Sequence, residues 1–167
     1  FKPINDTYGH AAGDELVGEL SRRLLGAVRP GDVVARFGGD EFAVLCQDLD
    51  SADAAGEAAR GAERLLPVVR EPFELRGDRV VTSVSIGVAI SGPGRADAEL
   101  LIRDADAAMY EAKRRGKDRH VAFDDRLERE THARLDLERA LQGAVGREEL
   151  ELEYQPNIAV PGGGYFW

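Results

Sequence analysis

One short segment, RFGGDEF, constrains the fold of this chain more than any other part of its sequence. It spans residues 36–42 and lies between two apolar runs, residues 33–37 and 42–46. Two such runs on either side of a glycine pair are typical of a β-hairpin, because glycine readily adopts the positive φ angles that a tight turn requires. The sequence therefore predicts a hairpin that carries two adjacent carboxylates, Asp40 and Glu41, at its turn.

Helical and strand patterns alternate around this hairpin. Residues 1–10 contain turn and cap residues, and leucines at helical spacing then indicate a helix that ends before Pro30-Gly31. The patterns also predict helices over about residues 52–70 and 97–115, a second hairpin with its turn at 76–78 and a long arm over 80–90, and a last strand over 120–123. This mixture predicts an α/β (α+β) fold in which helices flank antiparallel hairpins.

The chain changes character at Asp124. Residues 124–148 are highly charged with spaced leucines, which predicts a solvated connecting helix. The following segment, ELELEYQP, alternates like a strand, and the last residues, PGGGYFW, are typical of a loose end.

Composition and charge narrow the classes of partner. The 167 residues carry a formal net charge of −9, which argues against binding a nucleic-acid polymer, since such binding needs a basic surface. A small anionic ligand is compatible with this charge if a metal ion or a local lysine cluster offsets it. The single cysteine, Cys46, fits a reducing compartment such as the cytoplasm, and no apolar run is long enough for a membrane span.

Three groups of polar residues are candidates for a binding site, and each has an alternative explanation. Asp40 and Glu41 could bind a metal, or they could be the solvated tip of a hairpin; as neighbours on a strand they point to opposite faces. An amide and a carboxylate, Asn5 and Asp14, suit the edge of guanine, or they could be a helix cap and a first-turn charge. An i,i+4 lysine pair, Lys113 and Lys117, could bind phosphate, or it could complement the negative end of a helix.

The order of these motifs resembles the GGDEF domain of diguanylate cyclases. The signature itself is present as residues 38–42, and two further segments are similar to the family's flanking motifs: FKPINDTYGHAAGD at residues 1–14 and ADAAMYEAKRRGKDR at 105–119. The similarity covers about residues 1–123. It implies a nucleotidyl-cyclase-like fold with a central mixed sheet, and an enzyme that condenses two GTP molecules into cyclic di-GMP in a homodimer.

The resemblance also implies roles for individual residues. Asp40 and Glu41 would be catalytic residues and ligands of Mg²⁺ (or Mn²⁺), and Asn5 and Asp14 would bind guanine. The phosphate-binding residues would be Phe1, Lys2, Gly38, Gly39, Lys113 and Lys117. The family more often has arginine at position 117, and lysine keeps the charge but lacks the bidentate fork.

A second nucleotide site is implied by the RPGD sequence of residues 29–32, which resembles the family's R-x-x-D product-inhibition site. Arg29 and Asp32 would bind cyclic di-GMP, with Arg60 as an additional contact. The alternative is a plain turn at the end of a helix, for which Pro-Gly is ordinary.

Both ends of the chain depart from a complete GGDEF domain. The family has a strand with a metal-binding aspartate just before the FK segment, so we expect residues 1–123 to be a GGDEF domain without its first strand, and residues 1–167 alone to be inactive. Residues 149–167 are similar to the start of an EAL phosphodiesterase domain. The expected parent is a GGDEF–EAL protein, in the cytoplasm or tethered to a membrane by another segment. In such a protein the GGDEF domain could instead be a GTP-binding module that regulates the phosphodiesterase.

Overall fold

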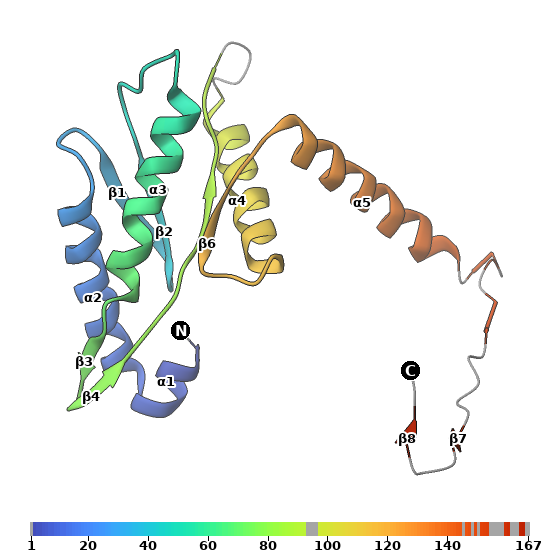
Figure 1. Cartoon of the computed structure of the whole chain (residues 1–167), viewed down its shortest axis with the longest axis horizontal. Coiled ribbons are helices and arrows are strands. Elements are labelled where there is room, and N and C mark those ends of the chain that lie inside the picture. Colours follow the sequence, from blue (N-terminus) through green and yellow to red (C-terminus); the bar gives the residue numbers. More distant parts are fainter. Residues whose placement is uncertain are drawn as a thin grey trace. The chain divides into compact units, whose positions relative to one another are not determined.

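The computed structural model describes residues 2–92, 97–144, 146–147, 149, 151–153, 159–160 and 164–165 (Figure 1). These residues form two compact units, residues 1–128 and 129–167. The first unit contains the hairpin and most of the helices. None of the described helices is long and apolar enough to cross a membrane.

The N-terminal segment is helical, which corrects the expectation of turns over residues 1–10. Helix α1 spans Lys2–Tyr8 and helix α2 spans His10–Ala27. Pro3 is compatible with the first turn of α1, where no hydrogen-bonded backbone N–H is needed. Gly9 separates the two helices with a φ of 82°. Residues with a Cβ atom rarely adopt this conformation, so the position favours glycine.

The predicted hairpin is confirmed. Strand β1, Val33–Gly38, pairs antiparallel with β2, Glu41–Leu45, and Arg36 lies opposite Phe42. The register shifts between Arg36 and Gly38, so the glycine pair forms an irregular turn, with φ of 152° at Gly38 and 52° at Gly39. Asp40 lies in this turn and Glu41 begins β2.

The second hairpin is shorter than the sequence pattern predicts. Helix α3, Ala54–Arg70, leads to β3, Phe73–Leu75, which pairs with β4, Asp78–Val80. The turn contains Arg76 and Gly77, both with positive φ. The expected long arm over 80–90 divides: its second half, β5 (Ser85–Val88), pairs in parallel with β6, Arg119–Ala122. Alternation alone cannot distinguish one long strand from two that pair with different partners.

Helix α4, Ala98–Arg114, packs closely against β5. The contact is tightest at Gly87, where a Cβ atom would collide with the backbone oxygen of Ala105 and the backbone nitrogen of Met109. Glycine at this position therefore sets how closely the strand and the helix approach.

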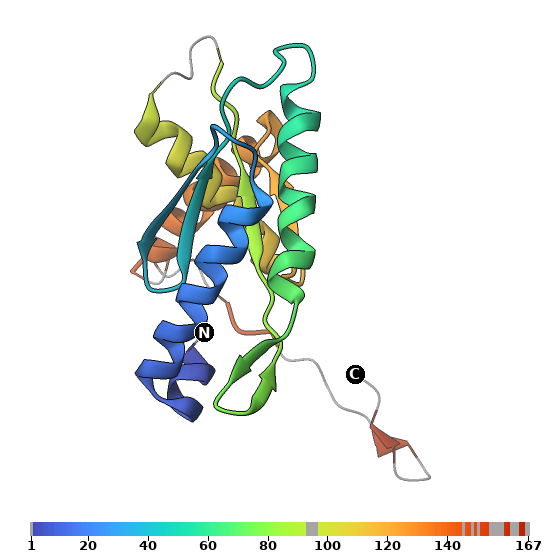
Figure 2. The same ribbon diagram turned by 90° about the vertical axis from the view of Figure 1, so that its left-hand side faces the viewer.

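The main core lies between α2, α3 and two separate strand pairs. Leu24, Leu65 and Val69 are buried in it. The strand residues that pack against them come from both pairs: Val34, Phe42 and Val44 from the β1–β2 hairpin, and Ile86 from β5, with Val84 just before that strand. Figure 2 shows α2 and α3 running alongside these strands. Helices flank these strand pairs, which confirms the α/β class. The described strands form two-stranded sheets only, and β1–β2 and β5–β6 are not hydrogen-bonded into one central sheet.

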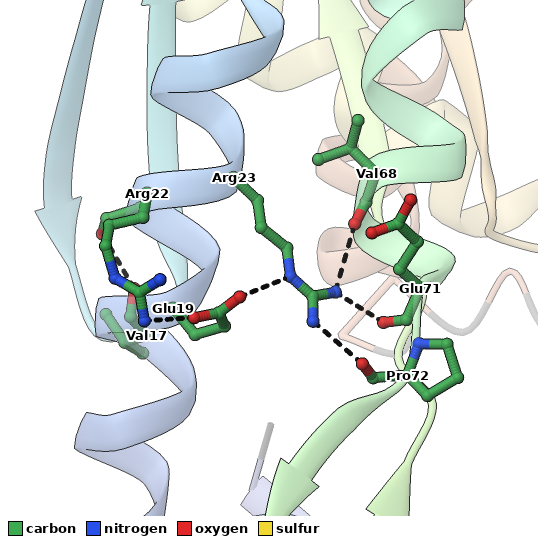
Figure 3. Close-up of polar contacts among 8 residues, drawn as sticks. Val17, Glu19, Arg22, Arg23, Val68, Glu71 and Pro72 are labelled. Atoms are coloured by element: carbon green, nitrogen blue, oxygen red, sulfur yellow. Dashed lines mark hydrogen bonds and ion pairs between the residues drawn. The ribbon is translucent and has the colours of Figure 1, made fainter.

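Arg23 of α2 connects the end of α3 to the start of β3 (Figure 3). Its guanidinium donates to the backbone oxygens of Glu71 at 2.7 Å and Pro72 at 2.8 Å, and Glu19 accepts a third bond from its Nε at 2.8 Å. The same group lies 3.9 Å from the centroid of the Phe73 ring. Carbonyls in the last turn of a helix lack partners within the helix, and Arg23 supplies a donor for one of them, the Val68 oxygen, at 3.5 Å.

The second unit contains most of α5, Asp125–Ala144, and a short pair of strands, β7 (Ala159–Val160) and β8 (Gly164–Tyr165). The strand expected in ELELEYQP is absent at residues 149 and 151–153, and the rest of that segment lies outside the described residues. Part of the expected loose end is therefore paired.

Candidate nucleotide-binding site

The hairpin tip is open and exposed. Asp40 and Glu41 are both exposed, and a Cβ atom added at Gly38 or Gly39 would meet nothing within 4 Å. The Arg36 guanidinium holds the turn, because its Nε and Nη2 donate to the backbone oxygen of Gly39 at 3.1 and 2.8 Å. The tip therefore presents bare backbone and two carboxylates in a fixed loop, an arrangement that admits a bulky phosphate group.

Asn5 and Asp14 lie on the two N-terminal helices, which pack against each other. Asn5 is inside α1 and not at its cap, and Asp14 is exposed on α2. The Oδ1 atom of Asn5 is buried without a hydrogen-bond partner. A buried polar atom in this state needs an explanation, and a ligand with N–H donors is one.

The lysine pair does not have the geometry that the sequence predicts. Lys113 lies in the last turn of α4, but the helix ends at Arg114, and Lys117 follows in a loop with φ of 59°. The i,i+4 argument applies only inside a helix, so it is wrong for this pair. Gly116, with φ of 105°, ends the helical conformation before Lys117 is reached. Both side chains are exposed.

The RPGD turn has a well-defined structure. Asp32 accepts from the backbone N–H of Arg29 at 2.9 Å and from that of Gln47 at 3.4 Å, while its own N–H donates to the Arg29 oxygen at 3.0 Å. The Asp32 carboxylate therefore stabilises the turn. Burial raises the pKa of the neighbouring Cys46 thiol, and Asp32 adds to that shift.

The arginines of this region are paired with carboxylates on α3 and at its N-cap. Nη1 of Arg29 lies 3.4 Å from Oε2 of Glu57, and Nη2 of Arg60 lies 2.8 Å from Oδ2 of Asp53. The hydrogen bond to Asp53 also raises the pKa of the Arg60 guanidinium. Arg29 and Asp32 lie in the turn between α2 and β1, and Arg29 contacts Glu57 of α3. Arg60 is one helical turn after Glu57, so all three predicted product-site residues lie in this region.

The donor set at the hairpin tip fits Mg²⁺ only together with a substrate. Within the described part of the chain, no group of three or more histidine, cysteine or acidic side chains could hold a metal ion. Mg²⁺ is, however, commonly bound by one or two carboxylates plus substrate phosphates and water. Asp40 and Glu41 supply those carboxylates. Phe1 lies outside the described residues, as does the side chain of Lys2.

Two arginines that the sequence reasoning missed support these segments: Arg36 clamps the glycine turn, and Arg70 contacts the loop that holds Lys117. Arg36 lies two residues before the signature, and this closeness in sequence is a local signal of its role. Arg70 and its partner are 48 residues apart, and no local pattern connects them.

Comparison with known proteins identifies the family. Residues 1–119 match the family described as "Diguanylate cyclase, GGDEF domain", and the chain belongs to this family. The chain is 39% identical over 164 residues to the bifunctional diguanylate cyclase/cyclic di-GMP phosphodiesterase MucR of Pseudomonas aeruginosa, covering 98% of this chain and 23% of MucR. The chain thus spans about a fifth to a quarter of the length of such curated relatives.

Solved structures agree with this assignment. A truncated TpbB from Pseudomonas aeruginosa, comprising only the GGDEF domain, matches with a TM-score of 0.72 and 38% identity, covering 78% of this chain and 75% of that one. The GGDEF domain of DgcB from Caulobacter crescentus, in complex with cyclic di-GMP, matches with a TM-score of 0.62 and 29% identity, covering 72% and 70%. The fold of the first unit is therefore that of a GGDEF domain.

Proposed function

We propose that this domain serves a diguanylate cyclase, which condenses two GTP molecules into cyclic di-GMP and releases pyrophosphate. The observation that carries the proposal is the open tip of the β1–β2 hairpin, where Gly38, Gly39, Asp40 and Glu41 are exposed together. The family membership supports the reaction class.

The proposed roles follow from the chemistry of the side chains. Asn5 and Asp14 bind the guanine edge, because an amide and a carboxylate together match its donors and acceptors. Gly38 and Gly39 admit the α-phosphate, and Lys113 and Lys117 bind the β- and γ-phosphates, with Phe1 and Lys2 contributing nearby. Asp40 and Glu41 hold Mg²⁺ or Mn²⁺.

A bound divalent ion would neutralise phosphate charge and polarise the attacking 3′-hydroxyl. The protein's own contribution is to orient each GTP, with Glu41 placed to help deprotonate that hydroxyl. An exposed tip also allows the half-sites of two protomers to face each other, so that each GTP is both nucleophile and electrophile. We propose a homodimer as the catalytic species for this reason.

The second candidate function is a GTP-binding module that regulates an attached cyclic di-GMP phosphodiesterase. Two observations favour it: MucR combines both activities in one chain, and Lys117 stands where the family more often has arginine. On this proposal residues 149–167 begin an EAL domain, and GTP binding at the same site changes the phosphodiesterase rate.

Incubation of the full-length parent protein with GTP and Mg²⁺, followed by separation of cyclic di-GMP from its linear product, tests the two functions. Cyclase function requires cyclic di-GMP that disappears in the Asp40→Asn and Glu41→Gln variants. GTP binding without any cyclic di-GMP, together with a GTP-dependent phosphodiesterase rate, would establish the regulatory module instead.

A further inference from the structure

The loop after α4 has an unusual backbone conformation. Gly116, Lys117 and Asp118 have φ of 105°, 59° and 51°, so three successive residues are left-handed. The left-handed region is disfavoured for residues with a Cβ atom, and two such residues in a row need support from their surroundings. Among the described residues, positive φ at neighbouring non-glycine positions occurs only here.

Part of the support comes from the loop itself. The N–H of Lys117 donates to the Ala112 oxygen at 3.0 Å, which closes the end of α4. The Nε of Arg119 donates to the Lys117 oxygen at 3.1 Å. Both polar backbone groups of Lys117 are therefore engaged, while its side chain is exposed and makes no contact that fixes the backbone.

The rest of the support comes from Arg70, the last residue of α3. Its Nε lies 3.0 Å from each carboxylate oxygen of Asp118, and its Nη2 donates to the Asp118 backbone oxygen at 3.2 Å. One guanidinium thus binds both the side chain and the main chain of the residue after Lys117. An ordinary surface ion pair fixes only side chains; this contact restrains a backbone.

We infer that Arg70 is a positioning residue, which acts through Asp118 to hold Lys117 toward the β- and γ-phosphates of GTP. This inference rests on the proposed role of Lys117 in phosphate binding. A planar fork suits the task, because it can bind a carboxylate and a carbonyl at once, whereas an ammonium is a single point charge. Without Arg70 the loop samples other conformations, and binding must order Lys117 at an entropic cost.

The test compares two nucleotides. GTP contains the β- and γ-phosphates and GMP does not, so a defect in positioning Lys117 weakens GTP binding and leaves GMP binding unchanged. Isothermal titration of the 167-residue chain with each nucleotide, in the presence of Mg²⁺, is expected to show a threefold to tenfold loss of GTP affinity for both Arg70→Met and Lys117→Met. The double variant is expected to lose no more than Lys117→Met alone.

Two further variants serve as controls. Arg79→Met removes one positive charge from another exposed arginine, which pairs with Glu74 on the β3–β4 hairpin, and is expected to leave both affinities unchanged. Arg70→Lys keeps the charge but lacks the planar guanidinium, so its GTP affinity is expected to fall as in Arg70→Met. If the circular dichroism spectrum of Arg70→Met differs from that of the wild type, Arg70→Lys takes its place in the comparison.

The outcomes separate the inference from the function on which it rests. If the wild-type chain binds no GTP, or if Lys117→Met binds GTP as tightly as wild type, the phosphate assignment of the proposed function is wrong. If Lys117→Met is weakened but Arg70→Met and Arg70→Lys are not, the positioning role is wrong. Equal losses for GTP and GMP in the Arg70 variants would also overturn it, because they would show a general structural defect.

Discussion

At the scale of single residues, we expect nucleotide selectivity to depend on the amide of Asn5, whose Oδ1 atom is buried, and on the exposed carboxylate of Asp14. A good base-edge contact contributes about 1–3 kcal/mol of discrimination. We therefore expect Asp14→Ala to weaken GTP binding by roughly tenfold or more, at about 1.4 kcal/mol per decade. Titration calorimetry with GTP and ATP measures the effect.

The neighbouring Glu15 provides the control for this prediction, because it is also an exposed carboxylate on α2. Glu15→Ala is expected to bind GTP as wild type does. Equal binding of ATP and GTP by the wild-type chain would contradict the guanine assignment.

The ion pair between Arg29 and Glu57 should compete with the product. Arg29 is already paired with Glu57 at 3.4 Å, so cyclic di-GMP has to displace this carboxylate before it can bind the guanidinium. We expect Arg29→Ala to relieve product inhibition and Glu57→Gln to tighten cyclic di-GMP binding by up to about fivefold, since an ion pair at the surface contributes about 0.2–1 kcal/mol. Binding assays with cyclic di-GMP measure both changes.

Glu74→Gln, a distant change of the same charge on β3, is the matched control and should leave product affinity unchanged. If Arg29→Ala is inhibited as strongly as the wild-type protein, the RPGD sequence is only a turn, as the alternative interpretation holds.

At the scale of elements, the contact between β5 and α4 depends on the absence of a side chain at Gly87. Gly87→Ala would drive a methyl group into the backbone of Ala105 and Met109, and neither backbone can rotate away as a side chain could. Overpacking of this kind costs about 1–3 kcal/mol. We expect a loss of that size in the free energy of unfolding, measured by urea denaturation.

Gly18 offers a matched glycine-to-alanine substitution with the opposite expected effect on stability. It lies inside α2, and a Cβ atom there would meet nothing within 4 Å. Gly18→Ala should stabilise the protein by about 0.5–1 kcal/mol, because alanine has the higher helix propensity. If both substitutions destabilise the protein to a similar extent, the clash at Gly87 is not the cause of the stability loss in Gly87→Ala.

At the scale of the whole first unit, the two strand pairs on one core have edges that pair with no other described strand. β1–β2 and β5–β6 share the core of α2 and α3, yet they are not hydrogen-bonded to each other. One face of the hairpin also exposes Val33, Phe37 and Leu45, with Phe37 at 61%. Unpaired edges and exposed apolar strands promote aggregation and limit stability.

We therefore expect residues 1–167 alone to show little cyclase turnover. A longer version of the protein that begins upstream of Phe1 is expected to be more active and to unfold at higher urea concentration if the added residues pair with these strand edges. Turnover with GTP and Mg²⁺, at equal protein concentration, compares the two. Comparable turnover would show that the unpaired strand edges do not limit the activity.

Local patterns in the sequence determined those features whose cause is local. The glycine pair between apolar runs predicts the β1–β2 hairpin and places Asp40 and Glu41 at its tip, because backbone conformation and strand propensity act over a few residues. Helical spacing likewise predicts α3 and α4 closely. Tertiary structure decided what depends on distant partners: the division of residues 78–90 between two sheets, the left-handed loop at Lys117, and the contact of Arg70 with Asp118 across 48 positions. These arrangements are set by which elements pack together, and a local pattern is compatible with several such choices.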